Sequence, residues 1–387
     1  MTALAGCSDQ GGSGGSGTVT FGHLAPLSGP FATIGKPSKK GADLAAKQIN
    51  NGDGDLSVEV THADTQGSPE TGVTKARELV QQDDVDVLIG FGSSSVAKAV
   101  SEFANTQNRL CVATIAQTPD ITTKNCNRVT FRTASNLDQL TNALARTTNE
   151  LSDGTRVAGI LPDYTFGKQT WNVYKQQMKS SGATVVNETF PSFGQGDYQN
   201  EIQETLNANP DIVYTSMWAG DLITFIKQAS GFDFFEQVPD FVAGSGAITD
   251  VSRSLGSSMK EMIAVDRYFF QYPDTQNNQQ FVDSWRSEYS EIPVNVGQET
   301  YAGVNGVVQA AAKSGGTSTD DLISGLEGLE WQAPEGTKTM RAADHQAIDD
   351  SIWTGAVGPV EDLDFYGFTE MLPVDGASVT PEPNCSL

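Results

Sequence analysis

The stretch Val85-Asp86-Val87-Leu88-Ile89-Gly90-Phe91-Gly92-Ser93-Ser94-Ser95 carries the strongest structural signal in the chain. Its first five residues form a short, mostly apolar run typical of a buried strand, and two glycines then allow a tight turn. The three serines open an amphipathic segment, so the strand is predicted to pass directly into a helix. A strand–turn–helix unit of this kind is the building block of a parallel sheet that helices cover on both faces.

The same alternation continues on both sides of this stretch. Strands are expected at 19–27, 56–63, 85–89 and 110–115, with helices at 35–51, 69–82 and 95–106 between them. The pattern restarts after Phe131-Arg132-Thr133 and runs through a second array of similar size. Two such arrays predict an α/β protein of two Rossmann-like lobes, with a ligand cleft outside the carboxyl ends of the strands.

The turn from Gly90 to Ser95 suits a small anion. Backbone N–H groups, the positive end of a helix dipole and three hydroxyls converge there. A plain helix cap is the structural alternative, although a cap uses one serine and three are present. A dinucleotide fingerprint would need glycine at Ser95 and would follow the first strand of its unit, so the sequence disfavours a Rossmann-type oxidoreductase.

Charge narrows the choice of partners and of environment. The chain has 387 residues, with 48 Asp+Glu against 24 Lys+Arg and a formal net charge of −24. This charge repels phosphate backbones and anionic lipid, so we expect no nucleic-acid partner. The acids are spread along the whole chain, in pairs such as Asp83-Asp84 and Asp320-Asp321. An evenly acidic surface stays soluble where salt screens repulsion, which indicates a high-salt, haloarchaeal-like origin.

The N-terminal residues Leu4-Ala5-Gly6-Cys7 resemble a lipobox, in which the cysteine is lipidated after signal cleavage. A Gly/Ser run at 11–17 follows and would act as a flexible tether. The chain contains no stretch of about 18 apolar residues that would span a membrane. These features predict an extracytoplasmic protein held at the outer face of the cell membrane by a lipid on Cys7.

Three further cysteines, Cys111, Cys126 and Cys385, could form one disulfide in an exported protein. Cys126 could pair with Cys111 in a short loop, or Cys385 could hold the C-terminal tail, and the sequence leaves both open. The histidines lie in no zinc motif, and neither a Gly-x-Ser-x-Gly elbow nor a P-loop occurs. We therefore expect no enzyme activity, no cofactor and no metal.

Five stretches, taken in order, resemble the type I periplasmic binding proteins of ABC importers, in the branch that binds leucine, isoleucine and valine. They lie at 26–30, 41–50, 85–95, 163–167 and 340–347. The resemblance implies two lobes joined by three hinge crossovers, near Thr133, Val265 and Ala333, which allow the lobes to close on a ligand. It divides the chain into a leader and tether at 1–18, lobe one at 19–133 and 265–333, lobe two at 134–264 and 334–376, and a tail at 377–387.

The resemblance also implies the ligand contacts. Three serines at the helix start would bind a carboxylate, the loop after the fourth strand would add a carbonyl and a hydroxyl, and aromatic residues of lobe two would pack on the ligand. The residues expected at the ligand are Ser93, Ser94, Ser95, Ala116, Thr118, Tyr164, Phe166, Trp218, Ser245 and Ile34. The implied partners are a small carboxylate-bearing solute and ABC permease subunits, and the binding protein itself is expected to be a monomer.

One departure from the family concerns the ligand amine. The position of the acidic residue that pairs with the ammonium in amino-acid binders falls at or near Ser245, and Asp163 and Asp221 are the candidates to substitute for it. A buried ammonium without a carboxylate costs several kcal/mol. The main hypothesis is therefore capture of a hydrophobic amino acid or a related small carboxylate. The alternatives are an organic or aromatic acid or amide as ligand, and a sensory ectodomain without a transporter.

Overall fold

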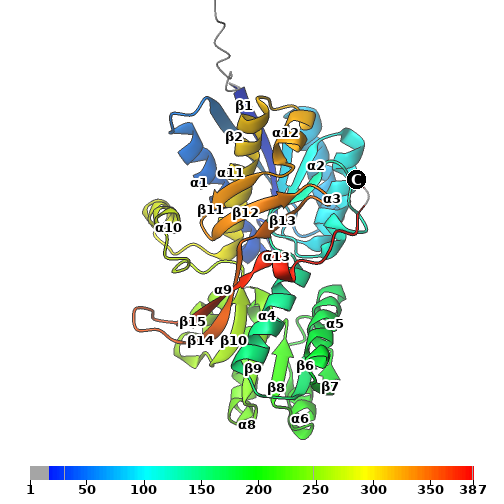
Figure 1. The fold of residues 1–387 in the computed structure, drawn as a ribbon, viewed down its shortest axis with the longest axis vertical. Helices are drawn as coiled ribbons and strands as arrows, with labels where there is room; N and C mark the ends of the chain where they lie inside the picture. Colours follow the sequence, from blue (N-terminus) through cyan, green and yellow to red (C-terminus); the bar gives the residue numbers. More distant parts are fainter. Residues whose placement is uncertain (1–16, 30, 247, 386) are drawn as a thin grey trace, which may run out of the picture.

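The computed structural model describes residues 17–29, 31–246, 248–385 and 387. For Ser245 it describes the backbone only. The chain forms two α/β lobes stacked along the long axis of the molecule (Figure 1). This confirms the predicted fold class of two Rossmann-like lobes. The expected lipidation site Cys7 and residues 8–16 of the tether lie outside the described residues.

Lobe one contains an eight-stranded sheet that is parallel at one side and antiparallel at the other. In spatial order its strands are β11 (Glu330–Ala333), β12 (Gly336–Arg341), β13 (Gln346–Asp349), β5 (Thr130–Arg132), β4 (Leu110–Ala113), β3 (Val87–Gly90), β1 (Gly17–Ala25) and β2 (Leu56–Asp64). Its helices include α1 (Ala32–Asn50), α2 (Pro69–Gln82), α3 (Ser94–Gln107), α11 (Asn295–Ser314) and α12 (Thr319–Leu326). β3 and β4 are buried along their whole length, as central parallel strands must be.

Lobe two contains a seven-stranded sheet of the same kind. In spatial order its strands are β15 (Tyr366–Asp375), β14 (Ser351–Pro359), β10 (Met262–Asp266), β9 (Asp240–Gly246), β8 (Ile212–Thr215), β6 (Arg156–Ile160) and β7 (Thr184–Thr189). Its helices include α4 (Leu137–Leu151), α5 (Thr165–Ser180), α6 (Gln199–Asn207), α7 (Ala219–Ser230), α8 (Phe234–Gln237) and α9 (Ile248–Leu255). Two hydrophobic clusters bury this sheet's side chains. No helix within the described residues is long and apolar enough to cross a bilayer.

The chain crosses between the sheets after β5, after β10 and between β13 and β14. The expected third crossover near Ala333, and with it the placing of 334–349 in lobe two, is wrong. Ala333 pairs with Gly336 across a tight antiparallel turn, and β12 and β13 continue the sheet of lobe one. A Pro-Glu pair that reads as a linker in the sequence is a hairpin turn, so the crossover falls at Asp350 instead.

A buried ion cluster lies beside these crossovers. The Lys338 ammonium on β12 is fully buried and contacts three carboxylates: Asp349 at 2.6 Å, Glu335 at 2.7 Å and Glu299 of α11 at 3.4 Å. Ser135, in the first crossover, donates a hydrogen bond to Asp349. Burial raises the pKa of Glu299 to about 8, and the negative charges of Glu335 and Asp349 add to this effect while Lys338 opposes it.

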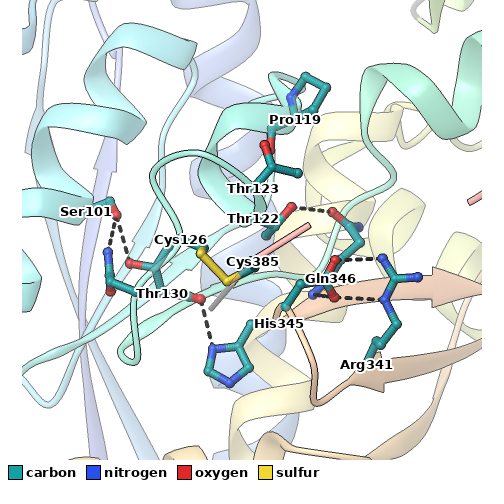
Figure 2. The surroundings of a disulfide bond; sticks show 12 residues. Ser101, Pro119, Thr122, Thr123, Cys126, Thr130, Arg341, His345, Gln346 and Cys385 are labelled. Atoms are coloured by element: carbon teal, nitrogen blue, oxygen red, sulfur yellow. Dashed lines mark hydrogen bonds and ion pairs between the residues drawn. A yellow bond between two sulfur atoms is a disulfide. The ribbon is translucent and has the colours of Figure 1, made fainter. Parts of the chain in front are cut away.

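The C-terminal tail makes a further connection between the lobes. After β15 it turns through α13 (Gly376–Val379), and Arg341 then donates a hydrogen bond to the Pro381 carbonyl at 2.9 Å. Cys385 ends the path in a disulfide with Cys126, which precedes β5 in lobe one (Figure 2). Of the two pairings left open, the tail pairing is confirmed, and Cys111 is a free, buried thiol. The disulfide therefore joins the tail, which leaves lobe two after β15, covalently to lobe one.

Candidate functional site

A large cleft of about 1440 Å³ lies between the lobes. Its lobe-one wall is formed by the start of α1, the start of α3 and the loop after β4. Its lobe-two wall is formed by the starts of α5 and α7 and by α9, and the second crossover and the start of α11 complete it. The cleft therefore lies at the carboxyl ends of the parallel strands, where the strand–helix alternation predicts it.

The turn from β3 into α3 presents its polar groups to this cleft. Gly90 has φ of +117°, and a Cβ there would lie 2.7 Å from the Leu24 carbonyl oxygen, so only glycine fits. Phe91, buried, is held in the left-handed region at φ of +70°. Ser93 occupies the N-cap position without a side-chain hydrogen bond to the helix; its Oγ lies 2.9 Å from Ser95 Oγ instead. The serines are therefore not explained as a helix cap.

The loop after β4 is fixed from behind by a buried arginine. Thr118 Oγ1 accepts a hydrogen bond from the Asp120 N–H at 3.4 Å and so caps the short helix at 119–122. Arg132 donates through Nη1 to the Thr118 carbonyl, through Nη2 to Thr122 Oγ1 at 2.6 Å, and through Nε to Gln346 Oε1 at 2.6 Å. Arg132 thus acts as a positioning residue for the loop that carries Ala116 and Thr118.

Aromatic side chains dominate the lobe-two wall. Trp218 and Phe193 stack with centroids 5.3 Å apart, Phe193 meets Tyr164 edge-on at 5.7 Å, and Tyr164 stacks on Phe166 at 5.9 Å. Trp218 Nε1 donates a hydrogen bond to Tyr164 Oη at 2.9 Å, and burial raises the pKa of Tyr164 to about 12, so this tyrosine is neutral. Phe31 of lobe one stacks on Trp218 at 5.9 Å, which brings the two lobes into contact across the cleft.

The second crossover places charged groups at the junction of the lobes. Asn295, at the start of α11, donates to the Gly246 carbonyl at 2.6 Å and to Asp266 Oδ1 at 2.8 Å, while Thr249 Oγ1 donates to Asp266 Oδ2 at 3.0 Å. Burial raises the pKa of Asp266 to about 6. The next residue, Arg267, is 7% exposed and lines the cleft. Arg267 Nη1 donates to the Ile115 carbonyl of lobe one at 3.1 Å.

The charge of the cleft differs from that of the whole chain. Five cations line it, Lys36, Lys40, Lys98, Arg253 and Arg267, against the four carboxylates of Glu102, Asp120, Asp250 and Glu291. Two of these carboxylates are paired, Asp120 with Lys98 at 3.2 Å and Glu291 with Lys40 at 2.8 Å. A net charge of −24 therefore does not prevent the cleft from accepting an anion.

Nine of the ten residues expected at the ligand line this cleft: Ile34, Ser93, Ser94, Ser95, Ala116, Thr118, Tyr164, Phe166 and Trp218. Ser245 lies on β9, and its side chain is outside the described residues. The two proposed substitutes for an amine partner do not line the cleft. Asp163 pairs with Lys168 at 2.6 Å, and Asp221 accepts a hydrogen bond from the Gly194 N–H at 2.9 Å.

Phe31, Phe193, Arg267 and Asn295 are among the lining residues that sequence reasoning missed. Phe31 lies three positions before Ile34, so the first loop does supply an aromatic side chain, from a neighbouring position. Arg267 directly follows the observed strand β10, which ends at Asp266, and no local pattern in the sequence distinguishes it. Phe193 and Asn295 stand in segments without a pattern that distinguishes them.

The chain was compared with protein families and known relatives. The family described as periplasmic binding protein matches residues 18–357. The Leu/Ile/Val-binding protein homolog 6 of Brucella melitensis is 25% identical over 382 residues, which cover 95% of this chain and 94% of that protein. The Leu/Ile/Val-binding protein homolog 3 of the same species is 29% identical over 198 residues, which span about half of either protein.

Solved structures give the same fold. An amino acid ABC transporter substrate-binding protein from Pseudomonas fluorescens superposes with a TM-score of 0.85 at 21% identity, over 96% of this chain and 99% of that one. A solute-binding protein from Rhodopseudomonas palustris, in complex with 3,4-dihydroxybenzoic acid, has a TM-score of 0.83 at 22% identity, over 93% and 98%. Because the family match spans most of the chain and both lobes, this chain belongs to the periplasmic binding protein family.

Proposed function

We propose that this protein is the substrate-binding protein of an ABC importer and captures a hydrophobic amino acid or a related small carboxylate by closure of its lobes. The observation that carries the proposal is the composition of one cleft. An anion-binding helix start and a buried arginine lie on or beside lobe one, and an aromatic wall lies on lobe two. A ligand with a charged end and an apolar body would contact both lobes and so favour the closed form.

The relatives support this range of ligands. One relative is named for leucine, isoleucine and valine, and one structural neighbour holds a dihydroxybenzoic acid. Both ligand types combine a carboxylate with an apolar body. The Ser93–Ser95 turn and the Tyr164–Trp218 wall offer complementary groups for each of these parts.

The cellular setting is part of the same proposal. A lipid on Cys7 would hold the monomeric protein at the outer face of the membrane, where an ABC permease receives the solute. The acidic composition supports work at high salt, because screening over a few ångströms removes repulsion between surface carboxylates.

A thermal-shift screen in high salt tests the proposed function. A ligand that binds the folded state alone raises the melting temperature. We expect at least one member of a panel of hydrophobic amino acids, aliphatic acids and benzoates to raise it in a concentration-dependent way. If no member of the panel raises the melting temperature, the proposed function is wrong.

A further inference from the structure

We propose that the Arg267 guanidinium holds the anionic group of the ligand, and that the cleft selects a carboxylate that carries no ammonium group. This inference rests on the proposed function and narrows its ligand class. Two observations support it: the position of the Arg267 side chain, and the partners that the surrounding carboxylates already have.

Arg267 is a buried cation without a carboxylate partner. No ion pair among the described residues includes it, and its Nε has no hydrogen-bond partner there. The charges of Glu299 and Asp266 act on Arg267, but neither carboxylate forms an ion pair with it. Asp266 accepts hydrogen bonds from Asn295 and Thr249, and Glu299 lies 3.4 Å from the Lys338 ammonium. A buried N–H that lacks an acceptor is destabilising, and a charged one more so. The Nε itself has almost no accessible surface, but a ligand carboxylate at the part of the guanidinium that lines the cleft would compensate the buried charge.

The side chain is fixed in a position that suits this role. The bond from Nη1 to the Ile115 carbonyl holds the guanidinium against the loop that continues to Ala116 and Thr118. β3 and β4 are neighbours in the sheet, so the Ser93 turn and this loop leave the sheet side by side. The guanidinium, the serine hydroxyls and the first N–H groups of α3 thus surround one part of the cleft. Several donors there favour an oxygen-rich anion.

Among the side chains that the structure describes, an α-ammonium finds no comparable partner in this part of the cleft. In an amino acid the ammonium is separated from the carboxylate by one carbon, so it would lie beside Arg267 and meet a like charge. Asp120 and Glu291 are paired with lysines. Asp250 lies on α9 one helical turn from Arg253, whose charge acts on its carboxyl group. Glu102 is exposed and lies about two helical turns beyond Ser95 along α3.

The rest of the cleft fits an apolar body. Ile34 packs with Ile115, Val294 and Val296 in a small hydrophobic cluster at the lobe-one side. The aromatic wall of Tyr164, Phe166, Phe193 and Trp218 faces it from lobe two. The ligand class is therefore a monocarboxylate with an aromatic or branched aliphatic body and without an amine.

Matched ligands test the inference by isothermal titration calorimetry on the full chain in high salt. The probes are L-leucine, its amine-free analogue 4-methylpentanoate, benzoate and benzamide. We expect 4-methylpentanoate to bind at least tenfold more tightly than leucine, and benzoate at least tenfold more tightly than benzamide. Leucine that binds as tightly as 4-methylpentanoate overturns the inference but leaves the proposed function standing. The absence of binding by every probe removes both.

Variants of Arg267 then separate its role from a structural one. In Arg267→Gln the benzoate-to-benzamide affinity ratio should fall toward one, while Arg267→Lys, which keeps the charge, should retain part of the preference. An unchanged ratio in Arg267→Gln overturns the assignment. If Arg267→Gln fails to fold, the comparison of acid with amide and of acid with amino acid on the unmodified chain decides the inference without it.

Discussion

The two walls of the cleft differ in chemistry although they come from lobes of the same architecture. The lobe-one wall presents hydroxyls, N–H groups and a guanidinium fixed by its bond to Ile115, whereas the lobe-two wall presents stacked aromatic rings. Polar groups on rigid elements give direction and charge selection, and aromatic surface gives apolar contact area with little directional demand. Lobe one should therefore decide which charged group is accepted, and lobe two should set how strongly the body is held.

The largest expected effect concerns the connection between the lobes and leaves the walls intact. Replacing Cys126 and Cys385 with serine removes a bond between residues 259 apart in the sequence. We expect the free energy of unfolding in urea to fall by about 3–5 kcal/mol, because the disulfide restricts the unfolded chain. The benzoate-to-benzamide ratio should stay the same, since neither cysteine lines the cleft.

Cys111→Ala serves as the control for this pair, because Cys111 is buried in lobe one and makes no disulfide. It should change stability through packing alone and by a smaller amount. A changed acid-to-amide ratio in the double serine variant would contradict the division of roles between the walls, because it would make ligand selection depend on the tail.

The next effect concerns the aromatic wall. Trp218→Ala removes the ring that stacks on Phe31 and Phe193 and donates to Tyr164. We expect a loss of about 2 kcal/mol in binding, roughly 30-fold, for benzoate and benzamide alike, because the ring contacts the body of the ligand. Isothermal titration calorimetry measures the affinity for each of the two ligands. Phe193→Ala, at a ring that is 46% exposed, should give the same pattern with a smaller loss. A loss confined to the acid would place charge selection in lobe two.

The buried ion cluster around Lys338 should make stability depend on pH. The raised pKa of Glu299 means that the folded state holds a proton which the unfolded chain releases, so stability falls as pH rises from about 4.5 to about 8. Glu299→Gln keeps the shape and cannot ionise. Its free energy of unfolding at pH 8 should exceed that of the unmodified chain by about 1–2 kcal/mol, with a smaller difference at pH 5.

Urea unfolding at the two pH values measures this effect, and Glu330→Gln at an exposed position of β11 is the matched control. An equal pH slope in the unmodified chain and in Glu299→Gln would show that the buried cluster does not hold the proton. The benzoate-to-benzamide ratio should be unaffected, because Glu299 does not line the cleft.

The smallest effect compares two serines at equivalent helix positions. Ser68 caps α2 and accepts a hydrogen bond from the Thr71 N–H at 3.3 Å, whereas Ser93 makes no such bond to α3. Ser68→Ala should lower the melting temperature and leave ligand affinity unchanged. Ser93→Ala should leave the melting temperature unchanged and weaken benzoate binding by about 1 kcal/mol. Equal melting losses for both would mean that Ser93 is a structural cap after all.

Local patterns predicted the strand–helix alternation and most of the cleft. The run at 85–89 is β3 in all but its first two residues, and the loops that follow strands carry Ser93, Thr118, Tyr164 and Trp218 into one cleft, because strand ends of parallel sheets meet at one edge. The features that were not predicted, the third crossover and the place of Arg267, depend on contacts between residues far apart in the sequence. The turn at Ala333 resembles a linker until β12 pairs with β11, and Arg267 gains its role when the crossover brings it to Ile115.

The central claim is that Arg267 and lobe one hold the ligand's charge while lobe two holds its body. A crystal structure of the chain with benzoate bound tests this most directly. The account predicts a carboxylate oxygen about 2.7–2.9 Å from the part of the Arg267 guanidinium that lines the cleft, the other oxygen at the Ser93 turn, and the ring against Trp218. A carboxylate held away from the Arg267 guanidinium would contradict the account.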